Sequence, residues 1–276
     1  AEPEAAAFMV GSAKNMIPLA GLIDKTAELA RLDKEITKRE QNIARLSGQL
    51  ANERFTASAP AAPVFNIFEL GIKDGQSAAY NHIGDENIRT SLAKEPGTLA
   101  IYSVKQKTNP QMAYMIEIYA DDAAYQTHIQ SPQYQKFREA SPQILTNHKH
   151  KYNIEPQYLG DKKVEQNKNT RTNFVSVTVK PEANEPFAKI VKAEMSESIA
   201  KENGVRVIYA ATDKAQPNKW YFFEIYDDDA AYQSHRDSPH FQKYLKETAG
   251  LLQDKTFTEI TPTLLQNQGG LEYRTP

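Results

Sequence analysis

The segment Glu117–Phe137 reads EIYADDAAYQTHIQSPQYQKF, and Glu224–Tyr244 reads EIYDDDAAYQSHRDSPHFQKY. The second segment follows the first, without a gap, at a shift of 224 − 117 = 107 residues. The same shift places Gly97 on Gly204, well upstream of the quoted stretch. A register that persists over this distance indicates a tandem duplication of a domain-sized unit, because solenoid repeats have much shorter periods.

The composition bounds the class of protein. A chain of 276 residues, 40% hydrophobic and 25% charged, is typical of a globular protein with about two domains. The net charge of −2 supplies no general field for nucleic acid or a membrane surface, and the absence of cysteine excludes disulfides, thiolate metal sites and a cysteine nucleophile. No apolar run is long enough to span a bilayer, and we expect no signal peptide. These features favour a cytoplasmic location, although an extracytoplasmic one stays open.

Both copies carry the same order of predicted elements. In repeat one, we expect strands over 65–73, 98–105, 112–119 and 149–157, and helices over 77–95, 121–128 and 131–145. In repeat two, we expect strands over 174–180, 205–211, 219–226 and 256–262, and helices over 185–202, 228–235 and 238–252. The order β-α-β-β-α-β predicts an α+β, ferredoxin-like unit, in which helices cover one face of a four-stranded antiparallel sheet.

The predicted domain boundaries follow from this pattern. A helical coiled-coil arm with its linker occupies 1–64, repeat one 65–160, a polar linker 161–172, and repeat two with a C-terminal tail 173–276. Each sheet has one face without helices, and that face is rich in Phe, Ile, Tyr and Met. We therefore expect the two sheets to pack face to face as a barrel within one chain. The tail after Pro262 is expected to lie over the neighbouring repeat.

An apolar residue recurs every seven positions in the segment before the repeats. The row comprises Leu22, Leu29, Ile36, Ile43 and Leu50. This spacing predicts a heptad seam on a helix that ends near Glu53. Residues 17–36 (IPLAGLIDKTAELARLDKEI) and 44–60 (ARLSGQLANERFTASAP) resemble the C-terminal coiled-coil arm of bacterial valyl-tRNA synthetase, a helical hairpin that contacts tRNA.

Two interpretations of this arm follow. In the first, a helix joined to a different protein acts as an oligomerising or loosely packed arm. In the second, it keeps a tRNA contact. Basic residues such as Lys34 and Lys38 alternate with Glu35 and Glu40, which is typical of a solvated helix face and favours the first interpretation. We therefore expect a homo-oligomer formed through the helix rather than a tRNA partner.

The motif E-x-Y-x-D-x-x-A…H-x-x-S-P-x-[YF] occurs in both copies, and Pro96-Gly97 precedes the second strand of repeat one. This pattern resembles the antibiotic biosynthesis monooxygenase superfamily of dimeric α+β barrels. The resemblance implies one of several activities: cofactor-free oxygenation of quinols and polycyclic phenols, haem degradation, or isomerisation of a phosphorylated autoinducer. The fold alone does not select among these activities.

Repeat one carries residues that repeat two lacks. The stretch 80–84 (YNHIG), with 95–97 (EPG) and His128, is similar to the autoinducer-processing branch, which has an Asn-His pair on the first helix. Asn81 and His82 supply that pair. Repeat two has Ala188 and Lys189 instead, so we expect only repeat one to hold a full site.

Two kinds of titratable residue recur in both copies. His128 and His235 either cap a short helix or act as a base or orienting group facing the barrel cavity. Glu117 and Glu224 lie in central strands. If inward, each is an acid with a raised pKa in an apolar cavity; if outward, each is a surface charge. Alternation places Glu117 on the face of Tyr119 and Met115.

The candidate residues divide into two groups. The catalytic candidates are His82, His128, Asn81, Glu117 and Tyr119. The substrate-binding candidates are Tyr102, Met115, His235, Glu224 and Tyr226. We predict neither a metal site nor a cofactor, since the sequence has no phosphate-binding Gly-rich loop, H-E-x-x-H or G-x-S-x-G motif.

The predicted function is cofactor-independent monooxygenation of a small quinol or phenol by O2, with His128 or His82 as the base. One alternative is isomerisation of a phosphorylated, autoinducer-like carbonyl compound, in which His82 and Glu117 move the proton. Another is a non-catalytic barrel that binds a hydrophobic ligand or serves as a scaffold.

Overall fold

The computed structural model describes residues 5–10, 13–18, 24–50 and 61–276, and the side chains of 24–48 and 61–276. The chain divides into two compact units, 1–60 and 61–276. None of the described helices is long and apolar enough to cross a bilayer. The predicted heptad positions Leu22 and Leu50, and the predicted helix end at Glu53, lie outside the described side chains or residues.

The N-terminal unit contains a hairpin and one long helix. Strands β1 (Ala5–Val10) and β2 (Ala13–Pro18) pair antiparallel, and α1 spans Lys25–Leu50. On α1, Arg31 bonds Glu28 and Glu35, and Arg39 bonds Glu35. The heptad side chains Leu29, Ile36 and Ile43 are each more than half exposed. The predicted amphipathic helix is therefore present, and Arg31 and Arg39 pair with glutamates along its own surface.

Repeat one forms a ferredoxin-like sheet. Its strands are β3 (Val64–Ile72), β4 (Thr98–Gln106), β5 (Met112–Tyr119) and β6 (Leu145–Lys151), and its helices are α3 (Ser77–Lys94), α4 (Asp122–Ile129) and α5 (Pro132–Ile144). The antiparallel order β4-β5-β3-β6 places the first and third strands at the centre. Asp121 and Ser131 cap α4 and α5 through their side chains, as the sequence predicts.

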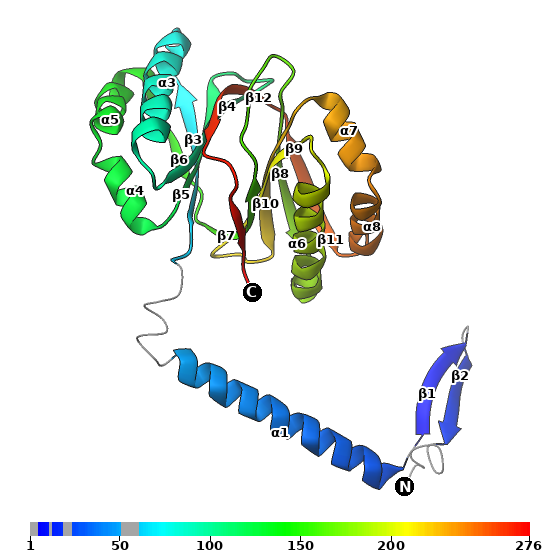
Figure 1. Ribbon diagram of the computed structural model, residues 1–276. Helices are drawn as coiled ribbons and strands as arrows, with labels where there is room; N and C mark the ends of the chain where they lie inside the picture. The colour runs from blue at the N-terminus through cyan, green and yellow to red at the C-terminus, as the bar shows by residue number, and fades with distance from the viewer. Residues whose placement is uncertain (1–4, 11–12, 19–23, 51–60) are drawn as a thin grey trace. The chain divides into compact units, whose positions relative to one another are not determined.

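Repeat two has the same architecture. Its strands are β8 (Arg171–Val179), β9 (Val205–Asp213), β10 (Lys219–Tyr226) and β11 (Leu252–Thr258). Its helices are α6 (Asn184–Lys201), preceded by a 3-10 turn at Pro181–Ala183, α7 (Asp229–Asp237) and α8 (Pro239–Thr248). In Figure 1, α3–α5 lie outside one sheet and α6–α8 outside the other, with the two sheets between them.

The structure differs from the sequence prediction at the fourth strand of each repeat. The strand expected over 149–157 is two strands: β6, and β7 (Ile154–Asp161), which pairs with β9 of repeat two. Similarly, β11 is followed by β12 (Ile260–Asn267), which pairs with β4 of repeat one. The final strand β13 (Glu272–Arg274) pairs with β7. Each repeat thus extends the sheet of the other, and the C-terminal tail covers the neighbouring repeat as expected.

The space between the two sheets is a packed core. It contains Phe65, Ile116 and Ile118 from repeat one, and Phe223 and Ile225 from repeat two, all buried. The hydroxyls of Tyr102 and Tyr209, which correspond in the two repeats, lie 3.0 Å apart, and the Tyr209 hydroxyl donates to Asp161. This core confirms the predicted face-to-face barrel. It also means that side chains, rather than a substrate, fill the space between the sheets.

Gly97 and its copy Gly204 mark a close approach that admits no larger residue. A Cβ added at Gly97 would lie 2.5 Å from Ala124 Cβ, and one at Gly204 would lie 2.6 Å from Ala231 Cβ. We expect Gly97→Ala to lower the free energy of unfolding by about 1–3 kcal/mol, because the clash overpacks the α4–β4 contact. Urea denaturation measures this change, with Gly75→Asn as a control at an open turn.

Candidate active site

A buried acid–histidine pair lies beneath the helices of repeat one. His128 Nδ1 lies 3.0 Å from Glu95 Oε1, and the imidazole is fully buried. Glu95 also accepts from the Thr98 hydroxyl at 2.9 Å and from the Gln133 amide at 2.5 Å. The other nitrogen, His128 Nε2, is buried without a partner. The carboxylate therefore fixes the imidazole and leaves one nitrogen uncommitted.

Glu117 is the second titratable group of this site. The Tyr119 hydroxyl donates to Glu117 Oε1 at 2.9 Å, and the Tyr119 ring lies 5.3 Å from the ring of His128. Burial raises the pKa of Glu117, and the His128 charge and the Tyr119 hydroxyl oppose that rise. A carboxylate with a raised pKa is a better proton acceptor near neutral pH than an ordinary one.

These residues lie on the helix-covered face of the sheet rather than in the barrel. Tyr114, Ile116 and Ile118 face the inter-sheet core, whereas the alternate residues Met115 and Glu117 face the helices. The prediction that His128 faces the barrel cavity is therefore wrong, because the motif histidine is on α4, which packs outside the sheet. The predicted shared face of Glu117, Tyr119 and Met115 is confirmed.

A cavity of about 370 Å³ opens beside Glu117. Strands β3, β5 and β6 form its floor, and α4 and α5 form its roof. Its apolar and aromatic walls include Phe68, Met115, Tyr125, Tyr134 and Phe137. Three basic residues, Lys73, Arg138 and Lys149, also line it. The cavity has the size and character of a site for a small aromatic ligand, with a single buried carboxylate in its wall.

Repeat two keeps the polar network and carries bulkier residues at the matching positions. Tyr226 donates to Glu224 at 2.6 Å, and His235 Nδ1 lies 2.9 Å from Glu202. At a shift of 107 residues, however, Ala113 becomes Trp220, Met115 becomes Phe222 and Gly84 becomes Val191. Trp220, Phe222 and Val191 are buried in the helix–sheet core of repeat two. Larger side chains therefore occupy the helix–sheet core of repeat two at these three positions.

Several predicted site residues lie elsewhere. His82 is exposed on α3 and does not line the cavity. Asn81 accepts from Lys105 Nζ at 2.8 Å. Tyr102 belongs to the inter-sheet core, on the opposite face of the sheet from Glu117. His235, Glu224 and Tyr226 form the equivalent network of repeat two. Of the ten candidates, four therefore lie together in repeat one: His128, Glu117, Tyr119 and Met115.

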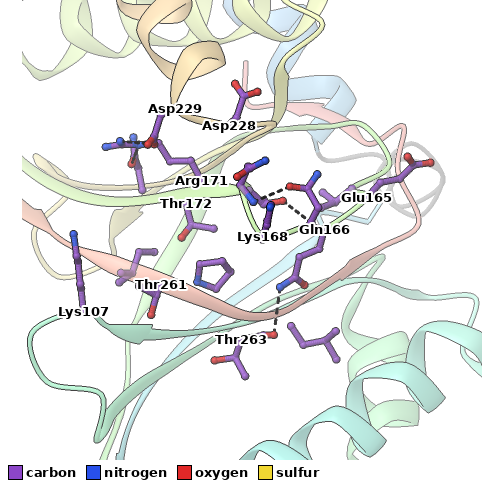
Figure 2. Close-up of a pocket in the computed structure, with 18 of the residues that line it drawn as sticks. Lys107, Glu165, Gln166, Lys168, Arg171, Thr172, Asp228, Asp229, Thr261 and Thr263 are labelled. Atoms are coloured by element: carbon purple, nitrogen blue, oxygen red, sulfur yellow. Dashed lines mark hydrogen bonds and ion pairs between the residues drawn. The ribbon is translucent and has the colours of Figure 1, made fainter.

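A second, larger groove is separate from this network. It measures about 1260 Å³ and is lined mainly by polar residues of the linker, β8 and β12. Figure 2 shows Arg171 paired with Asp229, and Gln166 directed toward Thr263. Its charges are of both signs, and Arg171 forms an ion pair with Asp229. We therefore assign the candidate site to the smaller cavity, which holds the buried carboxylate.

Four residues of the site were not among the candidates predicted from the sequence, although 95–97 formed part of the family resemblance. Asn66 is buried and is the register partner of Glu117 on β3, and Glu95 anchors His128. Tyr125 and Tyr134 line the cavity. The signal that could have found the first two is the duplication itself: Asn66 and Glu95 recur unchanged as Asn173 and Glu202.

Comparison with known families agrees with this geometry. The family model described as antibiotic biosynthesis monooxygenase matches residues 63–140 and 171–247, more than half of the chain. The chain therefore belongs to the antibiotic biosynthesis monooxygenase family, in two tandem copies. Residues 24–65 match the model described as the valyl tRNA synthetase tRNA binding arm, which agrees with the resemblance of the helical arm.

Two solved structures are similar over both repeats. A provisionally assigned monooxygenase from Fusobacterium nucleatum is 29% identical, with a TM-score of 0.73, and the match covers 78% of this chain and 99% of that one. Another, from Lactobacillus acidophilus, is 28% identical, with a TM-score of 0.73, over 77% of this chain and 99% of that one. The match therefore extends over nearly the whole of each of these two chains.

Proposed function

We propose that the repeat-one cavity catalyses cofactor-independent monooxygenation of a small phenol or quinol, with Glu117 as the base. The observation that carries the proposal is the buried carboxylate of Glu117, which lies beside aromatic and apolar side chains in the wall of the cavity. A phenolic hydroxyl bound there would have Glu117 as its proton acceptor. The membership of the chain in a monooxygenase family supports the reaction class.

Deprotonation is the step that the protein has to provide. A phenolate transfers an electron to O2 far more readily than a phenol does, and the resulting radicals combine at the ring carbon para to the oxygen. Loss of water from the hydroperoxide then gives the quinone, with the balance ArOH + O2 → quinone + H2O. One oxygen atom enters the product and the other leaves as water. The proton removed by Glu117 returns during the loss of water.

The network behind Glu117 fits this role. Tyr119 donates to the carboxylate, which fixes its orientation, and the imidazole of His128 packs against the Tyr119 ring. A cationic His128 stabilises the charged form of Glu117. The structure therefore favours Glu117 as the base and His128 as a positioning residue, whereas sequence reasoning favoured a histidine base.

The isomerase alternative has less support. It requires His82 and Glu117 to act on one substrate, but His82 is exposed on α3 and the cavity lining does not include it. The basic residues Lys73, Arg138 and Lys149 are compatible with an anionic substituent on either kind of substrate. They do not by themselves favour a phosphorylated carbonyl compound.

Oxygen uptake tests the reaction class. We expect 1-naphthol, as the probe, to be consumed by the wild-type chain with saturation kinetics and at a rate above that in buffer. Catalase should return no oxygen to the solution, because a monooxygenase forms water rather than hydrogen peroxide. A return of half of the consumed oxygen would instead indicate an oxidase, and an unchanged rate would contradict the proposal for this substrate class.

Exchange of residues between the repeats tests the cavity. Met115→Phe installs the repeat-two residue, and the larger side chain is expected to occupy part of the cavity. We expect kcat/KM to fall by roughly 10-fold or more, while the free energy of unfolding changes by about 1 kcal/mol or less. The reciprocal variant Phe222→Met serves as the control and should leave kcat/KM unchanged. Equal losses in both variants would place the substrate elsewhere.

A further inference from the structure

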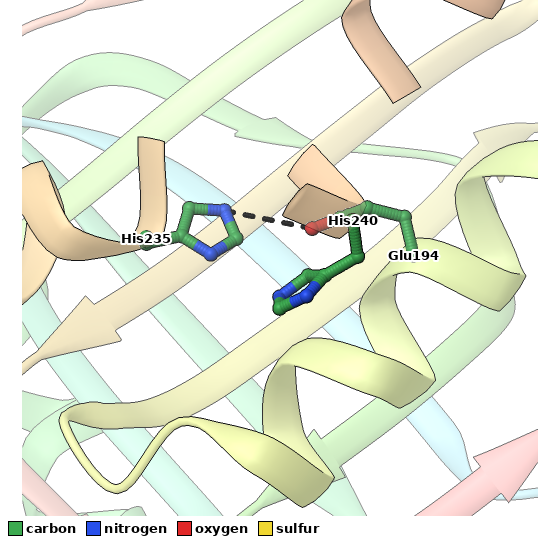
Figure 3. Close-up of side chains that lie close together, drawn as sticks. All are labelled: Glu194, His235 and His240. Carbon is green, nitrogen blue, oxygen red and sulfur yellow. Dashed lines mark ion pairs between the residues drawn. The ribbon is translucent and has the colours of Figure 1, made fainter. Parts of the chain in front are cut away.

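A second cluster of ligating side chains lies beneath the helices of repeat two, outside the proposed active site. Glu194 on α6, His235 on α7 and His240 on α8 offer one ligand atom each, all within 4.8 Å of one another. His235 Nε2 lies 3.6 Å from Glu194 Oε1, the pair joined in Figure 3. Three helices thus contribute two imidazoles and a carboxylate to one point.

Glu202, at the end of α6, organises both imidazoles. Its Oε2 lies 2.9 Å from His235 Nδ1 and 2.7 Å from His240 Nε2. These contacts leave His235 Nε2 and His240 Nδ1 as the nitrogens not bound to Glu202. In metal sites, a histidine ligand commonly donates its remote N–H to a carboxylate, which fixes the ring and strengthens the ligand. Here a single carboxylate does so for two rings.

Burial gives the cluster the character of a built site. The side chains of His235, Glu194 and His240 are 2%, 7% and 8% exposed, respectively. Burial raises the pKa of Glu194 to about 7, opposed by the charge of His235 and the Ser198 hydroxyl. A divalent cation bound by this carboxylate would offset the cost of burying its charge.

The duplicated scaffold shows that the helix packing does not require these side chains. The positions of Glu194 and His240 in repeat one are occupied by Asn87 and Gln133, whereas the histidine and the supporting glutamate are the same. Asn87 bonds Ser91, and Gln133 bonds Glu95. At these four positions, repeat two therefore differs from repeat one by two residues, Glu194 and His240, and each of them is a metal-ligating group.

From this geometry, we propose that repeat two binds one divalent transition-metal ion through Glu194, His235 and His240, with Glu202 as the supporting carboxylate. Two imidazoles and one carboxylate suit zinc, with a water molecule as the fourth ligand. Tetrahedral zinc with bonds of about 2.0–2.1 Å holds its ligand atoms roughly 3.3 Å apart, so small side-chain rotations close the present cluster onto the ion. The ion would tie α6 to α7 and α8.

Metal titration of the tag-free, chelator-treated full chain tests the site. With zinc chloride in calorimetry, we expect one ion per wild-type chain, and cobalt chloride should give the visible absorption of a four-coordinate ion. The double variant Glu194→Asn with His240→Gln carries the repeat-one residues and should bind at least about 100-fold more weakly. Glu202→Gln should weaken binding by about 10–100-fold.

Two further variants sharpen the result. Asn87→Glu with Gln133→His transfers the ligands to repeat one and should raise the stoichiometry to two ions. His148→Ala with His150→Ala removes the other closely spaced histidines, one of which bonds Glu69, and should leave one site intact. Circular dichroism and cooperative unfolding establish that each variant is folded. Zinc binding that survives in Glu194→Asn with His240→Gln would overturn the proposal. Zinc binding that disappears in His148→Ala with His150→Ala would overturn it as well.

Discussion

Glu117→Gln is expected to lower kcat for oxygen consumption by roughly 10²- to 10⁴-fold, the usual contribution of a general base. The amide keeps the size of the side chain and the contact with Tyr119 but cannot accept the phenolic proton. Glu224→Gln is the matched control, because Glu224 has the same tyrosine contact in repeat two. An equal loss of activity in both variants would contradict the assignment of the chemistry to repeat one.

The pH dependence of the wild type and of Glu117→Gln also tests the role of Glu117. Because burial raises the pKa of Glu117 above its ordinary value of 4.5, kcat/KM of the wild type should fall at higher pH than an ordinary carboxylate would cause. As the pH drops toward that raised pKa, the folded chain binds a proton that the unfolded chain does not. As the pH falls through this window, the free energy of unfolding of the wild type should therefore increase. Glu117→Gln should not show this increase.

Glu95→Ala is expected to lower the free energy of unfolding by about 3 kcal/mol or more. The carboxylate accepts from His128, Thr98 and Gln133, so its removal leaves buried donors without an acceptor. Denaturant unfolding of the wild type and the variant measures the difference.

The control for this prediction is the exposed ion pair between Glu86 on α3 and Lys136 on α5. Glu86→Ala removes the ion pair with Lys136, whose side chain is 59% exposed, and should cost about 1 kcal/mol or less. If Glu95→Ala and Glu86→Ala cost the same, the Glu95 cluster is not the buried network that the distances indicate.

The fold was largely predictable because the duplication fixed the element order twice. Asp121 and Ser131 were recognisable as caps, since short acceptor side chains at these positions satisfy free N–H groups. The fourth strand was not predictable in detail. Its alternation continues past Lys151 without a glycine or proline, so no local signal marks the point where the chain passes from one sheet to the other. The bulge near Pro156 comes only after that crossing.

The site was predictable in its motif residues and less so in its location. Alternation along β5 correctly placed Glu117 with Met115 and Tyr119, because successive side chains point to opposite faces. Alternation does not show which face of the sheet holds the site, because this depends on what packs against each face. Tyrosine and phenylalanine fill the space between the sheets, so the site lies on the face covered by helices. His82 stood out because repeat two lacks it, but its position on α3 directs it to solvent. The recurrence of Glu95 as Glu202 was the better signal.

The fate of isotopic oxygen tests the central claim most directly. With 1-naphthol as the probe under ¹⁸O2, the wild type and Glu224→Gln should form 1,4-naphthoquinone that carries one heavy oxygen atom, while Glu117→Gln should form no more than buffer does. The account would be contradicted by a quinone whose new oxygen comes from water, or by equal labelled product from wild type and Glu117→Gln.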